Sequence, residues 1–229
     1  MNDTLFTALA LIIPLVLAIV FHEVAHGYVA KLLGDPTAEQ QNRLSLNPLR
    51  HVDPVGTVIL PGFLALVKAP IFGWAKPVPV NKWRLRNPRT GMMAVAAAGP
   101  GTNLVLAAIG AVLLGLLIRL WGDEPATVAA MFLAENLKNF LLINVFLALF
   151  NLLPIPPFDG SHIVEGLLPR ELAAGYARLR PYGFALLVVV LLVLPALFPS
   201  LGIVENLVVP PVEWASGHYL ALAQAVSGR

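Results

Sequence analysis

Long apolar segments alternate with short polar ones along this chain. Hydrophobic residues run almost unbroken over residues 5–33, 92–120, 136–153 and 182–204. Each run is about as long as a helix that crosses the hydrocarbon core of a bilayer, which takes roughly 20 residues. The pattern therefore predicts an all-α polytopic membrane protein, built as a helical bundle.

Residues 42–72 break the pattern. Their first part is polar and holds the pairs Asn47-Pro48 and Asp53-Pro54, and residues 55–72 are apolar but contain two glycines and two prolines. Proline and glycine interrupt helices, and irregular backbone survives at membrane depth only where protein or a wet cavity covers it. We expect a re-entrant segment or a short β-hairpin near residues 42–72, and a broken helix is a further alternative for residues 55–72.

Composition supports a membrane location. Hydrophobic residues make up 58% of the chain and charged residues 12%, against about 25% charged in an ordinary soluble domain. The net charge of +2 does not indicate nucleic acid as a partner, and the lack of cysteine leaves His, Asp and Glu as metal ligands. We expect one transmembrane core over residues 1–204 and a short C-terminal tail over residues 205–229. Within the tail, residues 212–226 form either a surface helix or a loose end.

Basic residues mark one side of the expected membrane protein. Residues 73–91 contain five basic residues and no acid, and three arginines follow between residues 170 and 180. By the positive-inside rule both stretches are cytoplasmic, so the spans over 5–33 and 136–153 both run from outside to inside. The expected location is a bacterial inner membrane, with the C-terminal ends of these two spans near the cytoplasm.

The first span carries the sequence His22-Glu23-Val24-Ala25-His26. On a helix, residues four apart share a face, so the two histidines can bind one zinc ion while Glu23 handles a proton beside them. Ionisable side chains at membrane depth cost on the order of 2.5–3.5 kcal/mol each when charged, which argues for a function beyond contact between helices. We expect a site for one Zn²⁺ ion here.

A catalytic zinc ion takes three protein ligands and leaves a fourth position open for water. Asp159 is the best candidate for the third ligand, because three prolines between residues 154 and 157 prevent a regular helix before it. Gly160 would then allow a sharp turn that aims the carboxylate into the site. From these residues alone, Asp159 could also be a hydrated turn residue, and His162 is a rival ligand.

Two asparagines lie near the ends of later apolar spans. Asn103 sits just inside one span and Asn151 near the end of another. Either side chain could hydrogen-bond the substrate backbone or an oxyanion, or could simply bond one helix to the next. We expect these two residues as substrate-binding or oxyanion residues.

Three motifs together resemble the site-2 protease family of intramembrane zinc metalloproteases. They are His-Glu-Val-Ala-His-Gly at 22–27, Ala-Gly-Pro-Gly-Thr-Asn at 98–103, and Asn-Leu-Leu-Pro-Ile-Pro-Pro-Phe-Asp-Gly at 151–160. The resemblance covers roughly residues 10–170, and residues 42–57 are similar to the family's compact bacterial members. The family often has Asn-Pro-Asp-Gly in the last motif, where this chain has Pro-Phe-Asp-Gly and keeps the Asp-Gly pair.

The resemblance implies that His22, His26 and Asp159 hold zinc and that Glu23 is the catalytic carboxylate. Spans and loops use all residues between His26 and Asp159, so we do not expect the PDZ domain that many members carry there. We expect the short tail over residues 205–229 not to form the CBS domain that other members append. The implied activity is hydrolysis of peptide bonds in or near transmembrane segments of membrane-protein substrates, within the lipid bilayer.

A substrate helix must unwind locally before it is cut, because its amides are hydrogen-bonded internally. Residues 55–72 could add a strand to the unwound peptide. The alternatives are a catalytically silent pseudoprotease that binds membrane proteins, and a metal transporter. A transporter would need polar groups through several spans, whereas residues 104–118 and 183–194 are almost wholly apolar, and a pseudoprotease would usually have lost Glu23.

Overall fold

Three long apolar helices form the frame of the protein. The structure is a computed structural model, and it describes residues 3–59, 63, 66, 73–122, 127–198, 200, 202 and 204–228. Helices α1 (Asp3–Leu32), α4 (Pro88–Trp121) and α5 (Val128–Asn151) are each long and apolar enough to cross a membrane. The described residues contain no β-strand, so the prediction of an all-α membrane protein is confirmed.

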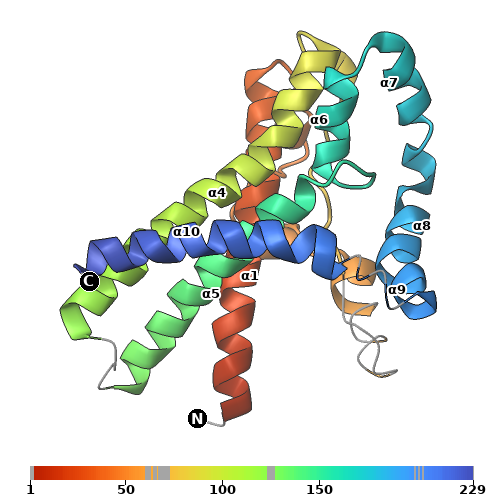
Figure 1. Cartoon of the computed structure of the whole chain (residues 1–229). Helices are drawn as coiled ribbons and strands as arrows, with labels where there is room; N and C mark the ends of the chain where they lie inside the picture. Colours follow the sequence, from red (N-terminus) through yellow and green to blue (C-terminus); the bar gives the residue numbers. More distant parts are fainter. Residues whose placement is uncertain are drawn as a thin grey trace.

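The three long helices pack against one another in pairs. Figure 1 shows α1 and α5 running in one direction and α4 in the other. Their shared core contains small side chains, with Ala107 and Ala111 of α4 buried against Leu141 and Val145 of α5. Small residues let helix backbones approach closely, which is how helices associate where lipid removes the hydrophobic driving force.

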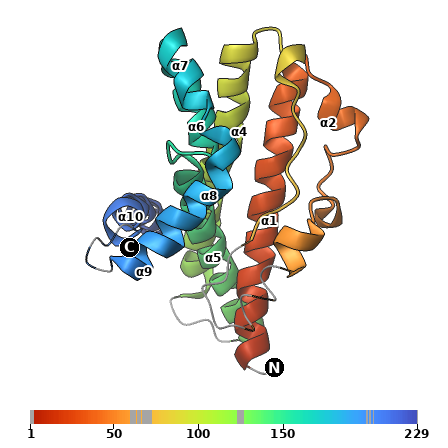
Figure 2. The same ribbon diagram turned by 90° about the vertical axis from the view of Figure 1, so that its right-hand side faces the viewer.

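The C-terminal residues form a further helix, α10 (Val209–Ser227), which follows the short helix η7 (Val204–Val208). Figures 1 and 2 show α10 lying across α4 and α5, and Ala215 and Ala223 of α10 join the core of those two helices. Sequence analysis left open whether residues 212–226 form a helix. In the structure they are helical and packed against the bundle.

The fourth predicted apolar run, residues 182–204, is helical over a shorter distance. It contains α8 (Gly183–Val188), η5 (Val189–Val193) and α9 (Leu194–Leu197), one directly after the other. Together they are shorter than the roughly 20 residues that cross a bilayer. Helices α6 (Asp159–Leu167) and α7 (Arg170–Ala177) and the turn η4 (Arg180–Tyr182) connect α5 to this stretch.

No β-hairpin forms in residues 42–59, so that part of the prediction for residues 42–72 is wrong. The segment contains η1 (Pro48–Arg50) and η2 (Pro54–Ile59) instead. The side chains of Asn47 and Asp53 accept hydrogen bonds from backbone N–H groups two residues on, and the prolines that follow them start helical turns. Most of the predicted re-entrant residues 55–72, from residue 60 on, lies outside the described residues.

Residues 73–80 are extended and run beside α1. Two short helices flank this strip, α2 (Thr37–Gln40) after the end of α1 and η3 (Lys82–Arg84) after the strip. The fully buried Asp35 joins the two regions, because its carboxylate accepts hydrogen bonds from the backbone N–H groups of Thr37, at 3.0 Å, and Asn81, at 2.6 Å. The strip is thereby fixed to the C-terminal end of α1.

The contact between α4 and α10 supplies a test of the fold. A Cβ added at Gly115 of α4 would collide with the carbonyl oxygen of Ala223 and lie 2.8 Å from Cβ of Val226. We expect Gly115→Ala to lower the free energy of unfolding in detergent by about 1–3 kcal/mol, the usual cost of overpacking. Gly217→Ala in α10 is the matched control, because nothing lies within 4 Å of its added Cβ. The control should be neutral or stabilising by up to about 1 kcal/mol, and equal destabilisation of both variants would contradict the packing.

Candidate metal centre

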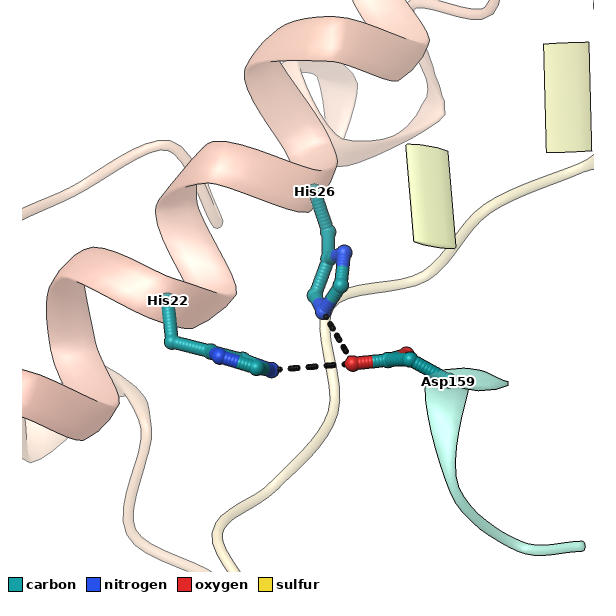
Figure 3. A group of neighbouring side chains, drawn as sticks. All are labelled: His22, His26 and Asp159. Atoms are coloured by element: carbon teal, nitrogen blue, oxygen red, sulfur yellow. Dashed lines mark hydrogen bonds and ion pairs between the residues drawn. The ribbon is translucent and has the colours of Figure 1, made fainter. Parts of the chain in front are cut away.

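Three side chains from distant parts of the sequence meet at one point. Nε2 of His22 lies 3.1 Å, and Nε2 of His26 3.2 Å, from the same carboxylate oxygen, Oδ2 of Asp159. Figure 3 shows the two imidazole rings of α1 converging on the carboxylate at the start of α6. Both histidines are buried and Asp159 is partly buried. In the described part of the chain, this is the cluster of histidine and acidic side chains that could hold a metal ion.

Local structure explains how Asp159 reaches the histidines. Helix α5 ends at Asn151, before the three prolines, and α6 begins at Asp159. Phe158 is buried and its ring packs edge-on against that of Phe150, with centroids 4.5 Å apart, which anchors the backbone directly before Asp159. Gly160 was expected in a sharp turn but lies in the first turn of α6. A side chain there would collide with the carbonyl groups at the end of α5, so close approach is what requires glycine.

The hydrogen bonds of the Nδ1 atoms of His22 and His26 determine that the Nε2 atoms face the site. Nδ1 of His22 donates to Oδ1 of Asn103 at 2.5 Å, and Nδ1 of His26 donates to the carbonyl oxygen of Val95 at 2.7 Å. A neutral imidazole that carries its proton on Nδ1 presents a lone pair on Nε2. Two such lone pairs and the oxygen of Asp159 would repel one another at these distances unless a cation lies between them.

The donor set fits a divalent metal ion. Ligand atoms about 2.0–2.2 Å from a tetrahedral ion lie about 3.3–3.5 Å apart, close to the observed 3.1 and 3.2 Å. Gly99 of α4 leaves room beside the ligands, because a Cβ there would lie 2.5 Å from Nε2 of His26 and 2.6 Å from Nε2 of His22. The residues present can therefore hold the ion that the sequence motif implies.

Asn103 lies behind His22, outside the cavity that contains the metal ligands. It is fully buried, and its Nδ2 donates to Oδ1 of Asn144 at 2.7 Å and to the carbonyl oxygen of Ala18 at 3.2 Å. Both the oxygen and the nitrogen of its amide are hydrogen-bonded to protein groups. These contacts indicate that Asn103 orients His22, and they do not favour the expected contact of Asn103 with substrate. Asn144 was not among the predicted site residues, although it is a polar side chain in an apolar span; its Nδ2 donates to the carbonyl oxygen of Phe140.

Glu23 lies beside the two histidines and contacts the extended strip. Its Oε2 accepts a hydrogen bond of 2.7 Å from the backbone N–H of Val78. The guanidinium of the buried Arg43 donates to the carbonyl oxygen of Lys76 at 2.7 Å, which holds the strip two residues before Val78. One carboxylate oxygen of Glu23 is therefore fixed by a backbone donor on a braced segment.

The three metal-site residues and Glu23 line a cavity of about 990 Å³. Residues 73–80 form one of its walls, and Phe184 of α8, which packs edge-on against Trp74, forms another. Asn151 also lines the cavity, and its Nδ2 is bonded to the carbonyl oxygen of Leu147. This position is compatible with the expected contact to substrate, which stays a prediction.

His162, the rival ligand, does not join the metal cluster. It lies one turn after Asp159 on α6 and lines the same cavity. Its Nδ1 accepts a hydrogen bond of 2.9 Å from Nη2 of Arg180. Its ring is therefore directed to a basic side chain instead of the two histidines of α1.

Gly99 provides a test of the metal site that leaves every ligand in place. In Gly99→Ala the added methyl group would occupy the space beside both Nε2 atoms, so we expect most of the bound metal to be lost. Metal content of the purified protein, measured by inductively coupled plasma mass spectrometry, reports this loss. Gly101→Ala on the same helix, where nothing lies within 4 Å of the added Cβ, should keep the metal content of the wild type. Equal metal content in the two variants would be incompatible with the described site.

Asn103→Ala tests whether this residue orients His22. Loss of a partner that fixes a ligating histidine typically lowers metal affinity about 10- to 100-fold, and we expect a decrease in that range. Competition with a chelator of known affinity measures it. Asn136→Ala is the control, because Asn136 bonds the carbonyl oxygen of Phe132 within its own helix. The proposed role fails if Asn103→Ala binds metal as tightly as this control.

Comparison with known proteins agrees with this site. The family model described as Peptidase family M50 matches residues 10–194. The chain is 42% identical over 179 residues to "Putative zinc metalloprotease YwhC" of Bacillus subtilis, covering 78% of each chain. It is 33% identical over 181 residues to "Putative zinc metalloprotease Rip2" of Mycolicibacterium smegmatis, covering 79% of this chain and 65% of the relative.

A Mycobacterium tuberculosis protein, also named "Putative zinc metalloprotease Rip2", is 31% identical over 172 residues, covering 75% of this chain and 62% of the relative. The chain thus spans less than two thirds of these two mycobacterial relatives. No solved structure is significantly similar to it. The match over most of the chain and the identity to the Bacillus protein confirm the resemblance noted from the motifs, and the chain belongs to peptidase family M50, the site-2 protease family.

Proposed function

We propose that this protein is a zinc-dependent endopeptidase that cleaves transmembrane segments of membrane proteins inside the bilayer. The observation that carries the proposal is the convergence of His22, His26 and Asp159 beside Glu23, on a helix long and apolar enough to cross a membrane. Family membership supports peptide hydrolysis, and the printed names of the relatives support zinc.

Zinc fits the donors better than magnesium or calcium. Two imidazole nitrogens and one carboxylate oxygen match the ligand set of catalytic zinc sites in hydrolases, which keep the fourth position open. Carboxylate-rich sites would favour magnesium or calcium, and this cluster has a single carboxylate. A zinc ion held by His22, His26 and Asp159 would act as a Lewis acid that lowers the pKa of water from 15.7 to about 7 and polarises the scissile carbonyl group.

Glu23 would move the proton in this reaction. Its carboxylate adjoins the two histidines in sequence and lines the same cavity. It accepts a proton from the attacking water and delivers it to the nitrogen of the leaving amine. The hydrogen bond from Val78 to Oε2 holds the carboxylate in one orientation, so that its second oxygen is available to the cavity. The largely apolar walls of the cavity keep bulk water away from this proton transfer.

The extended strip offers a place for the unwound substrate. The backbone N–H groups of Trp74 and Lys76 donate to the carbonyl oxygens of Gly56 and His51, at 3.1 and 2.8 Å. Successive residues of an extended chain direct their backbone groups to opposite edges, so Ala75 directs its N–H and C=O away from these partners. Ala75 lines the cavity, and its backbone has no hydrogen bond within the described structure. We assign strand addition to residues 73–80; most of residues 55–72, for which it was expected, lie outside the described residues.

The charge distribution supports a cytoplasmic position for the site. The C-terminal end of α1 and the start of α4 lie at one end of the bundle, and the basic stretch 82–89 lies at that same end (Figure 1). By the positive-inside rule this end faces the cytoplasm. We therefore place the protein in a bacterial cell membrane, with its metal centre toward the cytoplasmic side and membrane proteins as its substrates.

Glu23→Gln separates hydrolysis from metal binding. Because glutamine cannot accept the proton, we expect cleavage to fall by at least about 10²- to 10⁴-fold while the metal content stays that of the wild type. Substrates are first identified by mass spectrometry of membrane peptides from cells that produce wild type or Glu23→Gln. Cleavage of an identified substrate is then measured with purified protein in proteoliposomes.

Glu171→Gln is the matched control for this experiment. Glu171 is exposed at the start of α7 and lines neither the metal site nor the cavity, so its variant should cleave like wild type. Undiminished cleavage by Glu23→Gln would reject the assigned role of Glu23. Wild-type protein that binds membrane proteins without cutting any of them would indicate the pseudoprotease instead.

A further inference from the structure

A second, smaller cavity of about 210 Å³ adjoins the cavity of the metal centre. Lys82, His162 and Arg180 line both cavities, so they stand where the two meet. None of these side chains has a part in metal binding or in the proton transfer assigned to Glu23. Because these side chains lie in the cavity that a substrate must occupy, they could contact the substrate directly.

The smaller cavity has an excess of positive charge. Four basic side chains and one carboxylate line it: Lys82, Arg89, Arg170, Arg180 and Glu165. The ion pair between Arg180 and Glu165 satisfies the single acid. The guanidinium of Arg89 donates to the carbonyl oxygens of Gly166, at 3.0 Å, and Leu168. Lys82 and Arg170 have no acidic partner in the described part of the chain, and Lys82 contacts the ring of Trp83 at 4.9 Å.

His162 adds a neutral hydrogen-bond donor to this charge. A guanidinium group only donates, so Nδ1 of His162 must be the acceptor in its bond with Arg180, and the ring proton lies on Nε2. Burial, and then the charge of Arg180, lower the pKa of His162 to about 4, so the ring is neutral at physiological pH. No described residue accepts a hydrogen bond from Nε2 of His162. The junction of the cavities therefore presents donors and positive charge to whatever lies there.

We propose that Lys82, His162 and Arg180 form a subsite for the carboxylate of an acidic side chain of the substrate. The inference rests on the proposed function and adds a specificity to it: cleavage near an aspartate or glutamate. Carboxylates are the acceptors that arginine, lysine and an imidazole N–H bind together. A peptide is favoured over a lipid phosphate, because all three side chains line the cavity in which the scissile bond must lie.

The structure also limits where the acidic residue can be. His162 follows Asp159 by three residues on α6, so their side chains are neighbours, with Cβ atoms about 5–6 Å apart. An extended peptide advances about 3.3 Å per residue. With the reach of the side chains included, the acidic residue would lie about two to four residues from the bond that is cut.

Peptide binding tests the subsite without requiring turnover. The probes are two fluorescent peptides from an identified substrate that differ in one residue, Asp or Asn, about three residues from the cut, made for each side of the cut. Binding to Glu23→Gln protein in detergent is measured by fluorescence anisotropy. We expect the Asp peptide on one side to bind about five- to tenfold more tightly, as a partly exposed ionic hydrogen bond allows. This ratio should fall to about one when Lys82→Gln is added.

Two further variants make the result specific. Lys82→Arg keeps the positive charge and should keep most of the preference for Asp. Arg178→Gln removes an equal charge from an exposed residue that lines neither cavity, and should keep the whole preference. Unchanged metal content in every variant shows that the fold around the metal centre is intact. Loss of the preference in Arg178→Gln as well would assign it to overall charge and overturn the subsite.

Cleavage of the same peptides by otherwise wild-type protein separates this inference from the proposed function. If both peptides are cut at one rate and bound equally, the subsite is wrong and the protease assignment stands. If neither peptide is cut but the binding ratio responds to Lys82→Gln, the subsite holds and the hydrolytic function fails. A third outcome would overturn the proposal in favour of lipid phosphate as the ligand of the cations. In that case the Asp and Asn peptides bind equally, and cleavage requires anionic phospholipid in the wild type but not in a Lys82 variant.

Discussion

The structure depends on one contact between distant parts of the chain: a carboxylate oxygen of Asp159 within 3.1 and 3.2 Å of two imidazole nitrogens on α1. This contact can exist only if the segment after α5 stops being helical at the depth of His22 and His26. The prolines between 154 and 157 end the helix, and Phe158 then fixes the backbone by packing against Phe150. The metal centre is therefore a consequence of where a helix ends as well as of which residues it carries.

Polar groups inside an apolar bundle must be satisfied by one another, and this constraint explains the surroundings of the site. Asn103 accepts from His22 and donates to Asn144 and to the backbone of Ala18, so α1, α4 and α5 are joined through one amide. An unpaired amide at this depth would cost several kcal/mol, so each partner is held in its rotamer by the others. The same bonds fix the tautomer of His22. The same hydrogen-bond network thus orients His22 and joins the helices of the bundle.

The helical frame and the candidate metal cluster could both be predicted from the sequence, because both follow from local rules. Apolar runs of sufficient length predict membrane spans. A spacing of four residues places two histidines on one face of a helix, and prolines predict where a helix ends. The contacts of Asn103 could not be predicted, since they depend on how three helices cross. Residues 42–59 form no β-hairpin because their Asn-Pro and Asp-Pro pairs initiate helical turns. The extended strip could have been predicted from Pro77 and Pro79, because a proline restricts the residue before it to extended backbone.

Helix α6 links the metal centre to the basic junction of the two cavities. Asp159, His162 and Glu165 are spaced by three residues and share one face of the helix, the first directed to the histidines of α1 and the other two to Arg180. A hydrogen-bonded helix keeps the separation between its residues constant, so the distance from Asp159 to His162 does not depend on loop conformation. A substrate carboxylate bound at the junction would therefore hold the peptide in one register relative to the metal. In this arrangement, the short helix that completes the candidate metal site would also select the bond that is presented to it.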